Sequence, residues 1–152
     1  MKSRSGEASH KRPRAVRTFL DSGVLIAAVN GEPTSKGPAL GVLKDPRRVF
    51  LSSPFVQLEV LSKARYFKHH AEYRFYQRYF RAAEMFTDAN TMLRRAAREA
   101  ARSGVGAMDA LHLVAARMLR ADEFVTTEKP RKSIHRSKLV KITYLYGPGD
   151  SR

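Results

Sequence analysis

The sequence contains no cysteine and no tryptophan, and acidic residues are scarce beside basic ones. Without cysteine the chain cannot form disulfides, thiolate zinc sites, iron–sulfur clusters or a thiol nucleophile. It also lacks the roughly 18 consecutive apolar residues that a membrane-spanning helix needs. The start of the chain has no secretory pattern, because its apolar run is short and follows Asp21. We therefore expect a cytoplasmic protein with no membrane partner.

The scarcity of acids leaves a net charge of +15 on 152 residues, from 29 Lys and Arg against 14 Asp and Glu. The excess lies at the ends: residues 1–18 carry +5, residues 129–152 carry +6, and the long segment between them carries only +4. This excess favours a polyanionic partner such as nucleic acid, and solubility is the simpler alternative. We expect residues 1–15 to be a disordered basic arm and residues 147–152 a flexible tail.

The length fits one domain, here placed at residues 16–146, and an apolar content of 43% allows a substantial core. Short apolar runs alternate with segments of helical periodicity, which favours an α/β fold with a parallel sheet covered on both faces. The predicted strands are 16–20, 48–51, 123–127 and 139–145. The predicted helices are 23–30, 39–44, 54–67, 71–85, 88–103 and 107–120, with Ser22 and Ser53 as N-caps and a loop over 31–38.

Acids in apolar surroundings are the informative residues of so basic a chain. Six acids of the central segment are assigned to loops, caps or polar helix faces, where water solvates them: Glu32, Asp45, Glu72, Glu84, Asp88 and Glu99. Asp122 and Glu123 rank low because they precede a predicted strand. The four that remain as candidates are Asp21, Glu59, Asp109 and Glu128.

The four candidates fall into two pairs. Asp21 and Glu128 follow predicted strands at their carboxyl ends, where open α/β sheets bind ligands. Glu59 and Asp109 lie on helices among apolar residues, where an unpaired carboxylate is costly. Each has an ordinary alternative: a helix cap for Asp21, a pair with Lys63 for Glu59, a favourable charge near a helix N-terminus for Asp109, and a loop position for Glu128.

Converging carboxylates repel one another unless protons or a cation neutralise them. Mg²⁺ or Mn²⁺ suits such a set, because both ions take oxygen ligands. One such ion, or two about 3.5–4 Å apart, can activate water and stabilise a phosphodiester transition state. The acids therefore indicate metal-dependent phosphodiester cleavage, and the bases indicate where a polyanion is held.

Three motifs occur in an order that resembles PIN-domain ribonucleases, of the kind found in VapC-like toxins and stand-alone bacterial proteins. They read TFLDSGVLIAAV, SSPFVQLEVLSKA and GAMDALHLVAARMLRADEFVTTEKP, and the resemblance covers residues 17–145. The third motif is the most specific. The resemblance implies a three-layer α/β/α sandwich with a central parallel sheet, and endonucleolytic cleavage of RNA that depends on Mg²⁺ or Mn²⁺.

Residue by residue, the resemblance implies that Asp21, Glu59 and Asp109 are catalytic metal ligands. It places Thr126 near the metal or its waters. Glu128 stands where a fourth metal ligand occurs, although many members have Asp or Asn at that position. The resemblance also implies a homodimer and, if the chain is a toxin, an antitoxin protein that holds it inactive.

Other residues carry secondary assignments. Six bases are assigned to nucleic-acid binding: Lys11, Arg12, Arg14, Lys129, Arg131 and Lys132. His112 is expected to be a buried, hydrogen-bonded core histidine. The aromatic segment 66–80 fits either an RNA-stacking surface or, preferably, a dimer interface. The alternative to an enzyme is a non-catalytic nucleic-acid-binding module whose acids are structural.

Overall fold

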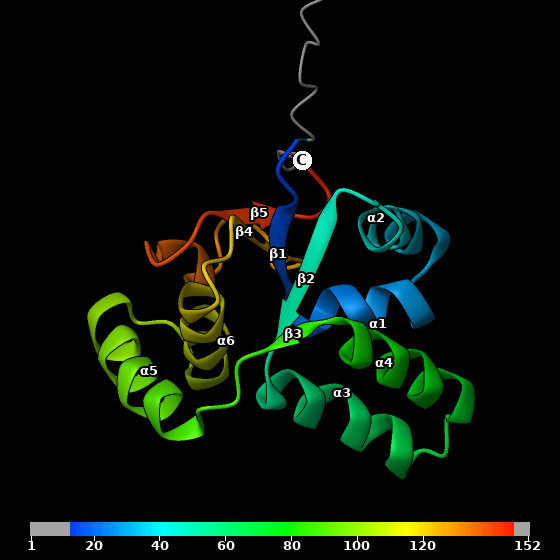
Figure 1. Ribbon diagram of the computed structural model, residues 1–152, viewed down its shortest axis with the longest axis horizontal. Coiled ribbons are helices and arrows are strands. Elements are labelled where there is room, and N and C mark those ends of the chain that lie inside the picture. The colour runs from blue at the N-terminus through cyan, green and yellow to red at the C-terminus, as the bar shows by residue number, and fades with distance from the viewer. Residues whose placement is uncertain (1–12, 148–152) are drawn as a thin grey trace, which may run out of the picture.

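The structure is a computed structural model that describes residues 13–147 (Figure 1). Lys11 and Arg12 of the expected arm, and the tail from residue 148, lie outside these residues. Five strands form one sheet in the order β3-β2-β1-β4-β5, and each neighbouring pair is parallel. The strands are β1 (Val16–Leu20), β2 (Arg48–Ser52), β3 (Glu84–Met85), β4 (Glu123–Thr126) and β5 (Ile142–Tyr144).

Helices cover both faces of this sheet (Figure 1): α1 to α4 lie on one face, and α5 and α6 lie on the other. Their bounds are α1 (Ser22–Asn30), α2 (Pro33–Leu43), α3 (Pro54–Tyr66), α4 (His70–Ala82), α5 (Ala89–Ser103) and α6 (Ala107–Met118), followed by a 3₁₀ turn at Ser133–Arg136. The predicted three-layer α/β/α sandwich with a central parallel sheet is confirmed. In the part of the chain that the structure describes, none of the helices has the length and apolar character to cross a bilayer.

The central strand β1 sets the position of the functional residues. Phe19 is fully buried and stacks on Phe124 of β4, with ring centroids 5.4 Å apart. The register pairs Leu20 with Val125, and the Asp21 amide donates to the Val125 carbonyl at 3.0 Å. Asp21 therefore lies at the carboxyl edge of the sheet, beside the end of β4. The order of the strands also reverses at this point, because β2 and β4 lie on opposite sides of β1. Ligands of open α/β sheets bind where the strand order reverses in this way.

The loop predicted over 31–38 is wrong, because helix α2 begins at Pro33 and continues through Pro38. Pro33 is in the first turn, where a missing N–H costs nothing. Ala39 is fully buried, and Leu40 and Leu43 pack against the core. Packing of this kind supplies most of a helix's stability, so it outweighs the turn-forming composition of the segment.

Two further boundaries differ from the prediction. Helix α4 ends at Ala82 rather than near 85, and Glu84 and Met85 form the short strand β3 instead. The Arg17 guanidinium donates to Glu84 at 2.6 Å, which fixes this strand at the edge of the sheet beside β2. At the other edge β5 covers only Ile142–Tyr144, which is shorter than the expected strand.

Several of the acids assigned to solvent are in fact held by protein groups, and Glu99 and Glu72 are examples. Glu99 is 4% exposed, and it accepts from Arg102 at 2.7 Å and from the Ser137 hydroxyl at 2.7 Å. The Glu72 carboxylate accepts from the Tyr76 hydroxyl at 2.7 Å and from Asn30 at 2.9 Å. Their partners come from other turns and other elements, which the position of an acid on a helix does not reveal.

The aromatic segment is divided between the core and the surface. Tyr76, Tyr79 and Phe80 are buried, so they pack in the chain's own core rather than on RNA or a second subunit. Tyr66 and Phe67 are 79% and 60% exposed, at the end of α3. Tyr73 and Phe75 are partly buried, so Tyr66 and Phe67 are the most accessible residues for either of the two predicted roles.

The close approach of α1 to the end of β4 depends on Gly23. A Cβ atom at this position would lie 2.4 Å from the Thr127 hydroxyl oxygen, which is too close for any real contact. We predict that Gly23→Ala lowers the free energy of unfolding by about 1–3 kcal/mol, as overpacking commonly does. Denaturant unfolding of the variant and the wild type measures the difference.

The matched experiment is the same substitution in a Thr127→Ala background, where the clashing atoms are gone. There Gly23→Ala should be neutral, or stabilising by up to about 1 kcal/mol, because alanine loses less backbone freedom on folding than glycine. A loss of the same size in both backgrounds would contradict the assigned contact.

Candidate active site

Asp21 is the most deeply placed acid of the site. Its side chain is 6% exposed and caps helix α1, because its Oδ1 accepts from the Ser22 amide at 2.8 Å. Asp21 is therefore the N-cap, and the prediction that Ser22 fills this role is wrong. Burial raises the pKa of Asp21, against the opposing effects of His112 and of a hydrogen bond from Thr126. The carboxylate is thus held in place by donors while its charge is poorly solvated.

Thr126 connects two of the predicted site residues. It is fully buried at the end of β4, and its hydroxyl donates to Asp21 Oδ2 at 2.8 Å. The same oxygen accepts from the Glu128 amide at 3.1 Å. Glu128 itself is exposed, and its carbonyl lies 2.8 Å from the His135 ring nitrogen. Thr126 therefore fixes the backbone of residue 128 relative to Asp21, whereas the Glu128 side chain reaches solvent.

Glu59 is half-buried on α3 and is held from two sides. Its Oε1 contacts Nε2 of His112 on α6, and its Oε2 accepts from the Ser22 hydroxyl at 3.3 Å. The hydrogen bond with His112 lowers the pKa of Glu59, against the effect of burial, and Lys63 adds only a smaller attraction. The helical pair with Lys63 that the sequence suggested is therefore not the main partner of Glu59.

His112 confirms the expectation of a buried, hydrogen-bonded core histidine, since it is 1% exposed. Its role as the partner of Glu59 was missed, because the two residues lie 53 positions apart on different helices. The available signal was the spacing of three residues from Asp109, which puts both side chains on one face of α6. Among the described residues, the other ring nitrogen of His112, Nδ1, has no hydrogen-bond partner.

Asp109 lies in the first turn of α6 and is half-buried. Burial and the charges of Asp21, Glu128 and Glu59 together raise its pKa to about 6, against the opposing effect of His112, and burial is the largest of these causes. A carboxylate whose pKa is raised by three other acids lies within their combined field. The other three acids singled out from the sequence thus act electrostatically on Asp109.

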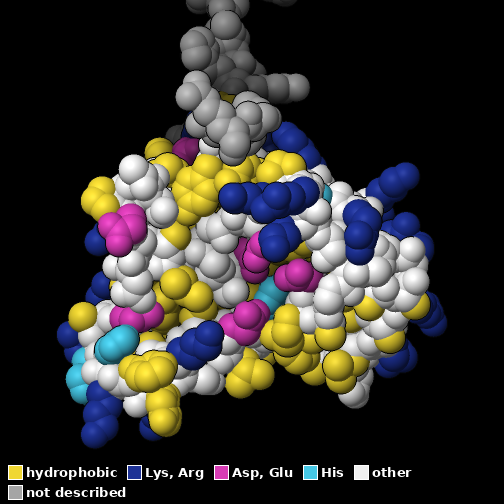
Figure 2. Space-filling view, turned by 180° about the vertical axis from the view of Figure 1, so that it is seen from behind, with side chains coloured by type: hydrophobic (Ala, Val, Ile, Leu, Met, Phe, Trp, Pro, Cys, Tyr) yellow, Lys and Arg dark blue, Asp and Glu magenta, His cyan; other side chains and the backbone are white. Residues whose placement is uncertain are grey.

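The surface of the molecule shows a corresponding hollow. On the face seen in Figure 2, acidic side chains gather around a hollow that also holds a histidine, and Lys and Arg side chains lie along its rim. Within residues 13–147, no group of three or more His, Asp or Glu side chains is placed so that it could hold a metal ion.

The predicted nucleic-acid-binding residues fall into separate places. Lys129, Arg131 and Lys132 are exposed in the segment that directly follows Glu128, on the side of the carboxylates. Arg14 instead precedes β1 and donates to Asp122 at 3.0 Å, at the opposite edge of the sheet. Only the first of these groups therefore lies next to the acids.

The chain is similar to one known domain family. A family model for the PIN domain matches residues 18–129, which include all five predicted catalytic and metal-binding residues. No curated protein matches the chain.

Two solved structures have a similar fold. One is VapBC2 from Rickettsia felis bound to a DNA fragment from the VapBC2 promoter, which matches with 16% identity and a TM-score of 0.64. A toxin–antitoxin complex from Klebsiella pneumoniae matches with 17% identity and a TM-score of 0.62. Each match covers 85% of this chain and 98% of the other chain.

The pKa of Asp109 predicts how stability changes with pH. Its folded value of about 6 lies above the ordinary 3.8, so between these values the folded state holds more protons than the unfolded state. As the pH rises and Asp109 loses its proton, the free energy of unfolding therefore falls. Asp109→Asn should remove this fall, because asparagine does not titrate. Relative to wild type, we expect the variant to gain about 1 kcal/mol between pH 4 and pH 7, allowing for solvent screening of a half-exposed group.

Denaturant unfolding of both proteins across this pH range, without divalent metal, measures the gain. Glu32→Gln is the control, because Glu32 is exposed and makes no side-chain capping bond at the start of α2. A difference between Asp109→Asn and wild type that stays constant with pH would contradict the assigned field.

Proposed function

The chain belongs to the PIN-domain family, whose members are nucleases, and we propose that it is a metal-dependent endoribonuclease. The observation that carries this proposal is the position of Asp109, where burial and the charges of Asp21, Glu128 and Glu59 together raise its pKa to about 6. A structural role alone would not gather like charges where the sheet offers a ligand site. The strongly basic remainder of the chain supports a polyanionic substrate, for which we propose RNA.

The residues present fit a hard divalent cation, Mg²⁺ or Mn²⁺. Asp21 and Asp109 would hold it, with Glu59 and Glu128 as further oxygen donors and water completing its coordination, because the charges of the other three acids act on Asp109 and that of Glu59 acts on Asp21. When bound, such a cation supplies an activated water and stabilises negative charge on the phosphate. A cation would also relieve the repulsion that Asp109 experiences.

The neighbouring side chains hold these donors in position. The Thr126 hydroxyl donates to Oδ2 of Asp21, and the Ser22 amide donates to Oδ1, with the Ser22 hydroxyl beside the same oxygen. These contacts fix the orientation of the Asp21 carboxylate. His112 keeps Glu59 ionised and directs it toward the same edge. Supporting hydrogen bonds of this kind orient metal ligands and commonly matter for affinity by about 10–100-fold. Lys129 then offers a cation for the substrate backbone next to Glu128.

We further propose that the protein acts in the cytoplasm as the toxin of a toxin–antitoxin pair. The support is that both structural neighbours come from toxin–antitoxin complexes and share its fold. At the end of α3, Tyr66 and Phe67 are 79% and 60% exposed, and their ring centroids lie 4.9 Å apart. Adjoining exposed apolar side chains are common at protein contacts, so we assign this pair to contact with an antitoxin or with a second copy of the chain.

Cleavage of total RNA tests the enzyme. We predict metal-dependent cleavage that EDTA abolishes and that Asp21→Asn and Asp109→Asn each reduce by more than about 100-fold, since loss of an outer-shell partner alone costs about 10–100-fold. Gel analysis of the RNA products measures the rates. Glu32→Gln, which removes an exposed acid away from the sheet edge, should cleave at the wild-type rate.

The alternative, a binding module with structural acids, makes the opposite prediction. It requires salt-dependent RNA binding with no cleavage at any concentration of Mg²⁺ or Mn²⁺. Cleavage at the wild-type rate in both Asp→Asn variants would equally contradict the proposed site.

Metal binding has a readout that does not depend on activity. Because a ligand that binds only the folded state stabilises it, Mn²⁺ should raise the melting temperature of the wild type in a concentration-dependent manner. The rise should be larger at pH 7.5 than at pH 5, since Asp109 must lose its proton to bind. Asp21→Asn should show little rise, whereas Glu32→Gln should match the wild type. An equal rise in all three proteins would place the ion elsewhere.

A further inference from the structure

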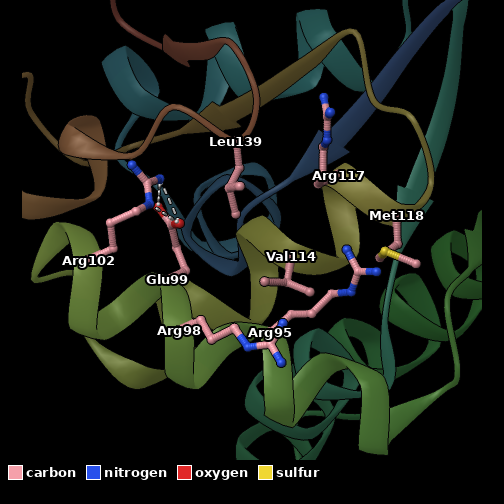
Figure 3. A pocket seen from close by; sticks show the side chains of 8 residues that line it. All are labelled: Arg95, Arg98, Glu99, Arg102, Val114, Arg117, Met118 and Leu139. Carbon is pink, nitrogen blue, oxygen red and sulfur yellow. Dashed lines mark hydrogen bonds and ion pairs between the residues drawn. The ribbon is translucent and has the colours of Figure 1, made fainter.

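A groove rich in arginine runs along α5 and α6. Two adjoining hollows, of about 190 and 560 Å³, share Arg95, Arg117 and Met118 among their lining residues. Together they are lined by six arginines, which we call the arginine groove: Arg14, Arg95, Arg98, Arg102, Arg117 and Arg120. Figure 3 shows the first hollow, with Arg102 against Glu99 at one end and Arg95 and Arg98 toward the other.

The groove is distinct from the carboxylate site. Asp109 lies in the first turn of α6, and Arg117 comes eight residues later, about 12 Å along the helix axis. Arg14 and Asp122 precede β1 and β4, so they lie at the edge of the sheet opposite to Asp21. A ligand in the groove would therefore not occupy the site of the reaction.

The two acids of the groove are already engaged. The Glu99 carboxylate accepts three hydrogen bonds from Arg102, at 2.7 to 3.2 Å. Asp122 accepts from the Arg14 guanidinium at 3.0 Å and from the Arg17 amide at 2.8 Å. The four other arginines of the groove are exposed, and within residues 13–147 none of them forms an ion pair: Arg95, Arg98, Arg117 and Arg120.

The arrangement of these cations suits a chain of anions. Arg95, Arg98 and Arg102 are spaced by three and four residues, so they line one face of α5 over about 10 Å. Like charges at this spacing repel, and a polyanion laid across them removes the repulsion. Every cation of the groove is arginine, whose planar fork binds phosphate with two hydrogen bonds.

The floor and the flanking sequence favour a nucleic acid over an acidic peptide. Met118 and Leu139, which are partly exposed, line the first hollow over the buried Val114, and they offer apolar surface to sugars and bases between the cations. Residues 1–12, which precede the groove residue Arg14 in the chain, add four bases and one acid by sequence. A phosphodiester strand carries an anion at every nucleotide and can follow such an extended series of cations.

We propose that the arginine groove is a second RNA-binding surface, which holds the phosphate backbone of the substrate away from the carboxylates. That the bound strand is the substrate rests on the proposed ribonuclease function. Backbone contacts of this kind set affinity and register without reading sequence. Binding and cleavage are then carried by different faces of the molecule and can be separated by substitution.

The test is equilibrium binding of a labelled, unstructured RNA of about 20 nucleotides to the full chain in EDTA, over a range of salt concentrations. The groove variant is R95Q/R98Q/R117Q. At low salt we expect its Kd to rise at least about 10-fold. The slope of log Kd against log salt should fall by about 2, because each phosphate of a single strand that the protein no longer neutralises lowers it by about 0.7.

The matched control is R74Q/R78Q/R81Q, which removes three exposed arginines from α4 on the other face of the sheet. It should leave the slope within about 0.5 of the wild-type value. The charge-preserving variant R95K/R98K/R117K should keep the slope, which shows that the groove variant is weakened by its missing charges and not by misfolding. Thermal unfolding of all three variants provides a second check of the fold.

Several outcomes would overturn the proposal. Equal losses of affinity in the groove and control variants would mean that net charge alone is responsible. An unchanged groove variant, or a loss confined to DNA of the same length, would remove RNA as its ligand. A loss of polyglutamate binding with unchanged RNA binding would assign the groove to an acidic protein partner. Because EDTA prevents cleavage, these results stand apart from the fate of the proposed activity, which Asp109→Asn tests without entering the groove.

Discussion

The carboxylates of Asp21, Glu59 and Asp109 can share one edge of the sheet because the charge of each is stabilised or neutralised in a different way. Asp21 is buried and accepts hydrogen bonds from a threonine hydroxyl and from an amide of the helix that it caps. Glu59 stays ionised beside His112. Burial of Asp109, together with repulsion from the other acids, raises its pKa to about 6.

The same constraint explains why the site depends on the whole fold. The acids come from β1, α3 and α6, and only a parallel sheet with helices on both faces brings these elements to one edge. The register of β1 with β4 places Thr126 opposite Asp21, so the pairing of the strands also sets the hydrogen bond between them. Fold stability and site geometry are thus coupled, because the buried hydrogen bonds that align the strands also orient the carboxylate.

The sequence predicted what local pattern can encode. Asp21 after an apolar strand and Asp109 in the first turn of an apolar helix were placed correctly, because strand ends and helix starts are short-range features. The partner of Glu59 was not predictable, since helical spacing pointed to Lys63, whereas His112 is brought close only by the packing of α3 against α6. Helix α2 was missed for a similar reason. Its turn-like composition is outweighed by burial of Ala39, which depends on the rest of the molecule.

Helix α6 shows how one element can serve opposite electrostatic needs. Its first turn carries Asp109, its buried middle carries His112, and its last turn carries Arg117. The helix dipole favours the acid at the N-terminal end and the base at the C-terminal end, so each charge lies where the backbone stabilises it. Asp109 of the candidate site and Arg117 of the arginine groove are thus held about 12 Å apart on one helix. Separation of charge along this helix therefore lets an acid of the site and a base of the groove belong to the same element.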